Sequence, residues 1–256
     1  MKSYFDSLYK GPIANYNASS WDFSKSMKNN KIKDISGNNF DLFLHRGLGL
    51  YKNEDGAIFL DGKSCWLETT KPVLCTNKSF SVATCLRLSV DPANQISILE
   101  SGVNAVTAVS QESKQLSSFH LGVRIKGEKS KMPPRWCFTL SPEKGDNDVH
   151  GCQDAFSNSY IDQFVLEKWF FLIGVCDYDK WEIRLHVPQL NEITIVSLPK
   201  TWVPWHADQK TIVGRGKWSG ENVDKWPGYI NQVLCFSEAL NENDVTKLYN
   251  DYFHFL

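Results

Sequence analysis

The stretch SFSVATCLRLSV, residues 79–90, decides the fold class of this chain. Alternate side chains of an extended strand point to opposite faces of a sheet. The alternation in this stretch is typical of a strand with one apolar face, and it predicts an antiparallel sheet. We expect one face to carry Phe80, Val82, Thr84, Leu86, Leu88 and Val90, and the other to carry Ser79, Ser81, Ala83, Cys85, Arg87 and Ser89.

Similar short runs follow along the rest of the chain. Residues 170–187 contain two apolar runs around a polar connection of hairpin length at 177–180. Many short strands at close spacing predict an all-β fold, a two-sheet antiparallel sandwich. Weaker strand candidates are residues 57–62, 65–70, 96–101, 119–126, 136–141, 192–199, 211–216 and 228–236.

The C-terminal residues carry the one helix that the pattern predicts. Asn241 is a good N-cap, Asp244 stands at the third helical position, and apolar residues recur at helical spacing from Val245 to Phe253. Residues 1–20 lack periodicity and are expected to form an N-terminal arm. Residues 21–256 are expected to form a single domain, because a chain of this length can bury a core without disulfides or metals.

Several motifs occur in a particular order from residue 21 to residue 249. They are WDF (21–23), DISGN (34–38), FLDG (59–62), SFSV (79–82), WFF (169–171), GVCD (174–177), IRL (183–185), VGRGKW (213–218), WPGYINQV (226–233) and VTKLY (245–249). In this order they resemble laminin-G-like jelly-roll domains of the concanavalin-A-like lectin and glucanase superfamily. The resemblance implies a jelly roll whose concave sheet face binds glycans. At Asn231-Gln232 the chain lacks two carboxylates that are usual in the family, which weakens any metal site at that point.

Composition limits the partners. The 28 Lys and Arg residues nearly balance 29 Asp and Glu, for a formal charge of −1, so we expect neither nucleic acid nor an anionic membrane surface as a partner. Membrane insertion is not expected, because no stretch approaches the roughly 18 apolar residues of a span. Asp6 and Lys10 interrupt any classical signal peptide. As numbered, the chain is expected to be soluble and cytoplasmic; an extracellular location and the oligomeric state stay open.

The seven cysteines are scattered and odd in number, without a C-x-x-C pair. Several fall within predicted strands, where a free thiol behaves as a small buried apolar group. Reduced core thiols are therefore expected, although one or two pairings could form if the chain is exported.

Aromatic residues gather in the predicted loops near the C-terminus, and sugar recognition uses flat aromatic faces together with planar polar groups. The alternative is that each Trp closes one end of the core. The residues predicted to bind a glycan or small-molecule ligand are Trp202, Trp205, His206, Arg215, Trp218, Asn222, Asp224 and Trp226.

A second candidate surface is the polar face of the central strands. His120, Gly122 and Arg124 alternate with apolar residues and would share one face. Such a face is either a ligand pocket or a solvated sheet surface. If the chain is an enzyme, the predicted catalytic residues are His120, Arg124, Trp136 and His186.

Calcium is the one cofactor that the sequence suggests, because the loop EKGDND (143–148) is rich in the oxygen ligands that Ca²⁺ takes. Its predicted ligands are Asp146, Asn147 and Asp148. The alternative is a solvated acidic loop with no cofactor.

Enzymatic signatures are mostly absent from the sequence, which lacks the alternating carboxylates of the related glucanases and the G-x-S-x-G and H-E-x-x-H motifs. Our first hypothesis is a lectin-like carbohydrate-binding module. The second is a cofactor-independent cyclase or isomerase that holds a small apolar metabolite in a shaped pocket. A protein-interaction role is the third.

Overall fold

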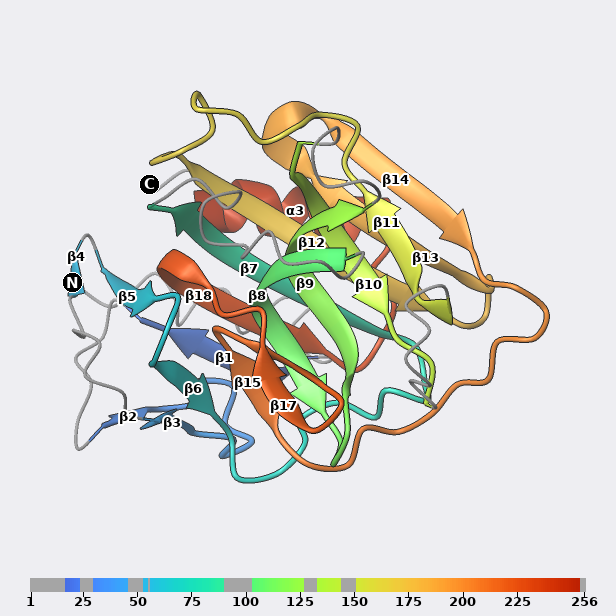
Figure 1. Cartoon of the computed structure of the whole chain (residues 1–256), viewed down its shortest axis with the longest axis horizontal. Coiled ribbons are helices and arrows are strands. Elements are labelled where there is room, and N and C mark those ends of the chain that lie inside the picture. Colours follow the sequence, from blue (N-terminus) through green and yellow to red (C-terminus); the bar gives the residue numbers. More distant parts are fainter. Residues whose placement is uncertain are drawn as a thin grey trace.

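The computed structural model describes residues 17–23, 30–45, 53–54, 56–89, 103–126, 133–143 and 151–253. These residues form two eight-stranded antiparallel sheets packed face to face, with one C-terminal helix (Figure 1). The predicted all-β, two-sheet sandwich is confirmed.

Sheet A lies behind in the view of Figure 1, with the helix on its far side. Its strands, in spatial order, are β14 (Glu192–Ser197), β13 (Glu182–Val187), β12 (Trp169–Asp177), β7 (Phe80–Leu88), β18 (Pro227–Phe236), β5 (Ala57–Asp61) and β4 (Asn53–Glu54), and β1 (Asn17–Asp22) also pairs with β18.

Sheet B lies in front. Its strands, in spatial order, are β11 (Gln153–Phe156), β10 (Arg135–Leu140), β9 (Ser117–Lys126), β8 (Val103–Glu112), β15 (Thr211–Val213), β6 (Trp66–Glu68), β3 (Leu42–His45) and β2 (Lys31–Ile32). A small hairpin of β16 (Gly216–Trp218) and β17 (Glu221–Val223) and a 3-10 helix, η3 (Pro188–Leu190), complete the connections around the sheets.

The apolar face predicted for residues 79–90 points into the sandwich core. Phe80 of β7 contacts Phe119 and Phe138 of sheet B, with ring centroids 5.1 and 6.3 Å away. Val82, Leu86 and Leu88 belong to the same buried cluster. The strand and the inward direction of these side chains are therefore confirmed, while Val90 lies outside the described residues.

The opposite face of β7 is also buried, although the alternation indicated a half-buried strand. Ala83 and Cys85 pack in a second cluster with Val245 and Leu248 of helix α3 (Glu242–Phe253). The helix covers the outer face of sheet A, and small side chains on β7 leave room for it. Coverage of this face depends on tertiary packing, which a strand's own pattern does not encode.

Helix α3 begins with a reciprocal capping arrangement. The N–H of Asp244 donates to Asn241 Oδ1 at 3.1 Å, and the N–H of Asn241 donates to Asp244 Oδ2 at 3.2 Å. These bonds satisfy backbone groups that the first helical turn leaves free. The predicted N-cap is confirmed.

Two of the sequence motifs, DISGN (34–38) and FLDG (59–62), form turns that are held by the carboxylates of Asp34 and Asp61. Asp34 accepts hydrogen bonds from the N–H groups of Ser36 and Phe40, both at 2.9 Å, around Gly37, whose φ of +91° suits a residue without a Cβ. At the end of β5, Asp61 accepts bonds from the N–H groups that follow it.

Asn231, where the chain departs from the family pattern, lies at a register shift between β18 and β7. Its backbone carbonyl oxygen accepts a hydrogen bond from the N–H of Phe23 at 3.0 Å, and its side-chain Nδ2 donates to Gly56 O at 2.7 Å. Asn231 therefore joins β18 to neighbouring segments of sheet A through both its backbone and its side chain.

The sequence pattern did not predict several of the strands. Strand β8 (Val103–Glu112) is long and central, yet its sequence VNAVTAVSQE is rich in small and polar residues, whereas the strand predicted at 96–101 lies outside the described residues. Residues 17–20 of the predicted N-terminal arm are part of β1 and pair with β18, so that portion belongs to the sheet. Residues 1–16 lie outside the described residues.

All seven cysteines are free thiols, and six of them are buried. Burial raises the pKa of Cys65 to about 11 and that of Cys176 to about 12, so these thiols stay protonated. In the described part of the chain, helix α3 is too short and too polar to cross a membrane.

Candidate functional site

The segment of residues 198–210 connects β14, at the edge of sheet A, to β15 in sheet B. It is the orange loop along the right and lower margin of Figure 1. The N–H of Leu198 donates to Trp181 O at 2.8 Å. Further along, Trp205 Nε1 donates to Ser141 O, also at 2.8 Å. These bonds tie the segment to both sheets.

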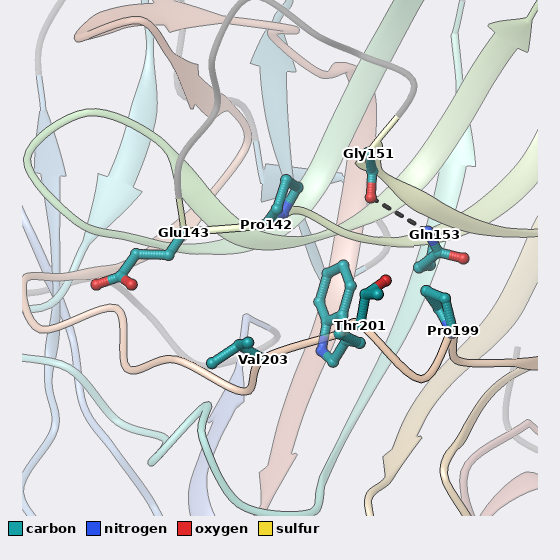
Figure 2. A pocket seen from close by; sticks show the side chains of 8 residues that line it. Pro142, Glu143, Gly151, Gln153, Pro199, Thr201 and Val203 are labelled. Atoms are coloured by element: carbon teal, nitrogen blue, oxygen red, sulfur yellow. Dashed lines mark hydrogen bonds between the residues drawn. The ribbon is translucent and has the colours of Figure 1, made fainter.

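A pocket of about 620 Å³ lies between this segment and the adjoining ends of β10 and β11 (Figure 2). It is open to solvent on one side. The residues that line it are Pro142, Glu143, Gly151 and Gln153 from sheet B and its connections, and Pro199, Thr201, Trp202 and Val203 from the segment.

The apolar part of the lining is anchored by Trp202. Its side chain belongs to the sandwich core and is only 7% exposed. Val203 is 68% exposed, and Pro199 is exposed as well, so they form the accessible part of the wall. The lining thus combines a rigid aromatic base with small apolar surfaces that solvent reaches.

The polar part of the lining consists of an amide, a hydroxyl and a carboxylate side chain. Gln153 Nε2 donates to the carbonyl oxygen of Gly151 at 3.1 Å, which holds the amide in place (Figure 2). Glu143 and Thr201 are both exposed. Figure 2 shows Gln153 and Glu143 on opposite sides of the pocket, with Thr201 between them.

Among the eight residues predicted for a loop ligand site, Trp202 is the one that lines this pocket. Trp226 is 0% exposed in the sandwich core. Trp205 packs with Leu116 in a small cluster, and the half-buried Trp218 packs against it. The prediction of an exposed aromatic platform is wrong for Trp226, because the residue directly precedes β18 and its side chain turns inward.

The remaining predicted loop residues have separate surroundings. His206 and Asn222 are exposed, and Asp224 is half-buried. Arg215 is buried in an ion-pair network, with Nη1 2.7 Å from Glu112 Oε2, and its guanidinium lies over the ring of Trp66. The positive charge of Arg215 is therefore paired inside the protein, and its role in ligand binding stays a prediction.

The four residues predicted to be catalytic do not converge. His120 and Arg124 share the outer face of sheet B, as predicted from their alternation. Trp136 points into the core, where its ring lies 5.1 Å from that of Phe170. His186 is buried on the outer face of sheet A, in a strand whose Arg184 binds Leu240 O at the start of the helix region. The set is divided between both outer faces and the core because β13 belongs to the other sheet, and because Trp136 of β10 points to the opposite side of sheet B from His120 and Arg124 of β9.

His120 is covered by the β16–β17 hairpin and is only 3% exposed. A Cβ added to Gly216 of that hairpin would lie 2.6 Å from the His120 ring, so the two are in close contact. The ring's Nδ1 is 3.2 Å from Thr107 Oγ1. Burial, with Arg124 acting in the same direction, lowers the pKa of His120 to about 3 and keeps the imidazole neutral.

Arg124 is also buried, and it forms an ion pair with Asp154, with 3.0 Å between Nη1 and Oδ1. The half-buried Asp224 lies near this pair. Burial raises the pKa of Asp224 to about 6, and the positive charge of Arg124 acts in the opposite direction. These polar residues on the outer face of sheet B are therefore paired or covered within the protein.

The predicted calcium ligands Asp146, Asn147 and Asp148 lie outside the described residues. Within the described part of the chain, no group of three or more His, Cys, Asp or Glu side chains could hold a metal ion. The calcium hypothesis stays a prediction.

Sequence reasoning missed Gln153, Gly151, Pro142, Pro199, Thr201 and Val203 as lining residues. Glu143 entered only as the first residue of the acidic loop. One signal was present in the sequence, because Trp202 stands between two prolines in SLPKTWVPW (197–205), a pattern typical of an irregular surface segment.

No protein-family model and no curated protein matches the chain. Solved structures do match. The binding domain of botulinum neurotoxin serotype D has a TM-score of 0.63 at 15% identity, covering 94% of this chain and 53% of that one. Domain 4 of AbnA, a GH43 extracellular arabinanase from Geobacillus stearothermophilus solved with arabinotriose, has a TM-score of 0.60 at 15% identity, covering 91% and 98%.

The chain spans about half the length of the botulinum binding domains that it matches. One of these, the neurotoxin DC domain in complex with rat synaptotagmin II, has a TM-score of 0.60 at 16% identity and covers 93% of this chain and 52% of that one. At these identities the comparisons establish a shared sandwich fold, which is a fold of carbohydrate-binding and receptor-binding domains.

Proposed function

We propose that this chain is a lectin-like carbohydrate-binding module with a laminin-G-like, concanavalin-A-like jelly roll, and that the pocket beside Trp202 holds the sugar. The proposal rests on the composition of that pocket. A sugar ring has apolar C–H faces and a rim of hydroxyl groups, so its site needs both apolar walls and a few directed polar groups.

The lining meets both needs. Pro142, Pro199 and Val203 supply apolar surface, and Gln153 and Thr201 supply an amide and a hydroxyl. The volume of about 620 Å³ lies within the range of roughly 300–1,000 Å³ found for small-molecule sites. The similar domain solved with arabinotriose supports the same ligand class.

The cyclase or isomerase hypothesis requires a shaped pocket with one or two hydrogen-bond donors, and its candidate catalytic residues are His120, Arg124, Trp136 and His186. Trp136 and His186 lie on different sides of the sheets from His120, so the four residues do not line one pocket. We therefore propose binding as the function.

The first test is a glycan-array screen with calcium and with a chelator, followed by titration of any hit. Gln153→Ala and Thr201→Ala each remove one polar group from the pocket without opening the core. Each is expected to weaken binding about three- to ten-fold, as for the loss of one hydrogen bond.

Trp218→Ala and Asn222→Ala are the matched controls, because both residues lie on the β16–β17 hairpin and neither lines the pocket. They should leave the affinity unchanged. A loss of binding confined to these two variants would move the site to the hairpin, and silence across the array would refute glycan binding. Loss of binding on chelation would support the calcium prediction.

A further inference from the structure

The pocket beside Trp202 presents hydrogen-bond acceptors more than donors. Gln153 uses one of the two N–H groups of its Nε2 to donate to Gly151 O, which leaves Oε1, an acceptor, and one N–H for a ligand. A carboxylate accepts hydrogen bonds and donates none when ionised, and a hydroxyl does both. Glu143 and Thr201 supply these two groups.

The charge of the lining is one-sided as well. Among the described residues that line the pocket, Glu143 is acidic and none is Lys, Arg or His. An anionic ligand group placed there would lose its hydration without gaining a cationic partner, and it would be repelled by Glu143.

We infer that this pocket selects sugars that are uncharged or carry an amino group, and rejects carboxylated, sulfated or phosphorylated ones. The inference rests on the proposed function, since it specifies the ligand class of the same site. Ring hydroxyls and ammonium groups supply the donors that Gln153 Oε1 and the Glu143 carboxylate need, whereas an acidic substituent supplies only further acceptors.

The test compares immobilised glycans that differ in charge on a similar scaffold. Suitable probes are lactose against sialyllactose, galactan oligomers against oligogalacturonate, and N-acetylglucosamine trimers against glucosamine trimers. In the first two pairs we expect the acidic member to bind about five-fold or more weakly at low salt, with the difference shrinking as salt screens the repulsion. In the third pair we expect the glucosamine trimer to bind at least as tightly as its neutral partner.

Glu143→Lys tests the residue directly. The side chain is exposed, so the variant should fold. We expect it to raise affinity for the acidic glycans about five-fold and to lower affinity for the amino sugar. Glu238→Lys makes the same change in net charge at an exposed position next to helix α3, outside the pocket, and should change neither.

The outcomes separate the two proposals. Acidic members that bind as tightly as their neutral partners, with no effect of Glu143→Lys, would overturn the charge selection and leave carbohydrate binding intact. Absence of binding to every probe would overturn the proposed function itself.

Discussion

Arg124 of β9 and Asp154 of β11 form an ion pair across the intervening strand β10, with 3.0 Å between Nη1 and Oδ1. Their side chains are only 6% and 3% exposed. Thr139 of β10 donates from its hydroxyl to the same Oδ1 at 2.7 Å. Burial would lower the pKa of Arg124, but the Asp154 carboxylate outweighs it and raises that pKa.

Removing one partner of this pair should destabilise the fold strongly. Asp154→Ala leaves the Arg124 charge buried without its counterion, so we expect a loss of about 3–5 kcal/mol in the free energy of unfolding. Urea denaturation measures it. The double variant Arg124→Met with Asp154→Ala should be more stable than Asp154→Ala alone, and equal stability of the two would refute the buried-charge explanation.

Gly174 of β12 is required by the packing of Phe138. A Cβ at position 174 would lie 2.4 Å from the Phe138 ring. Overpacking of this kind typically costs about 1–3 kcal/mol, so Gly174→Ala should lower the unfolding midpoint. Phe138→Leu should relieve part of that loss in the double variant. Strictly additive effects would mean that the ring is not the obstacle.

Asp61 should contribute to stability at neutral pH but not in acid. Burial alone would raise its pKa, but hydrogen bonds from Ser64 and its neighbours outweigh burial and hold the pKa below the usual 3.8. The folded state therefore keeps this carboxylate charged at pH values where the unfolded chain protonates it, and the contribution is lost as pH falls below about 4.

The matched variant for this effect is Asp61→Asn. We expect it to be about 1 kcal/mol less stable than the wild type at pH 7, as for one net hydrogen bond, with the difference shrinking toward pH 3. Denaturant titrations at several pH values measure the difference. A constant difference across that range would show that the charge of Asp61 is not involved.

His120 should make the fold sensitive to mild acid. Its pKa falls from 6.5 to about 3 on folding, mainly through burial, so between these values the unfolded state binds the extra proton. Stability from this group is fully present above pH 6.5 and declines as pH drops toward 3, with a slope of up to about 1.4 kcal/mol per pH unit.

Nuclear magnetic resonance of the histidine rings can detect this directly. The His120 imidazole should remain neutral at pH 5, and His120→Gln should reduce the slope of unfolding free energy against pH below 6.5. Protonation of His120 in the folded protein near pH 6 would contradict the buried position under the β16–β17 hairpin.

The main strands were predictable because their alternation is a local property. Residues 79–90 and 170–187 contain complete apolar faces, and the structure has β7, β12 and β13 at those positions. Strand β8 was not predictable in the same way, since its small and polar residues form no continuous apolar face, and its place in the sheet depends in part on pairing with β15, which is distant in sequence.

The candidate site was predictable only in part. Trp202 was identified from the concentration of aromatic residues, and Glu143 from the acidic loop. Gln153 lies in a short strand without an apolar pattern, and it lines the same pocket as Thr201 only because the segment of residues 198–210 lies beside the end of β11.

The sequence by itself determined the all-β class, the inward face of β7 and the capped C-terminal helix, because each of these depends on residues close together in the chain. It also determined the nearly neutral charge balance, which depends on composition alone. Only the tertiary structure decided that Trp226 is core, that His120 and His186 lie on opposite outer faces, and that a pocket forms beside Trp202. These depend on which strands become neighbours, and pairing between distant segments is settled by burial and hydrogen bonding over the whole sandwich.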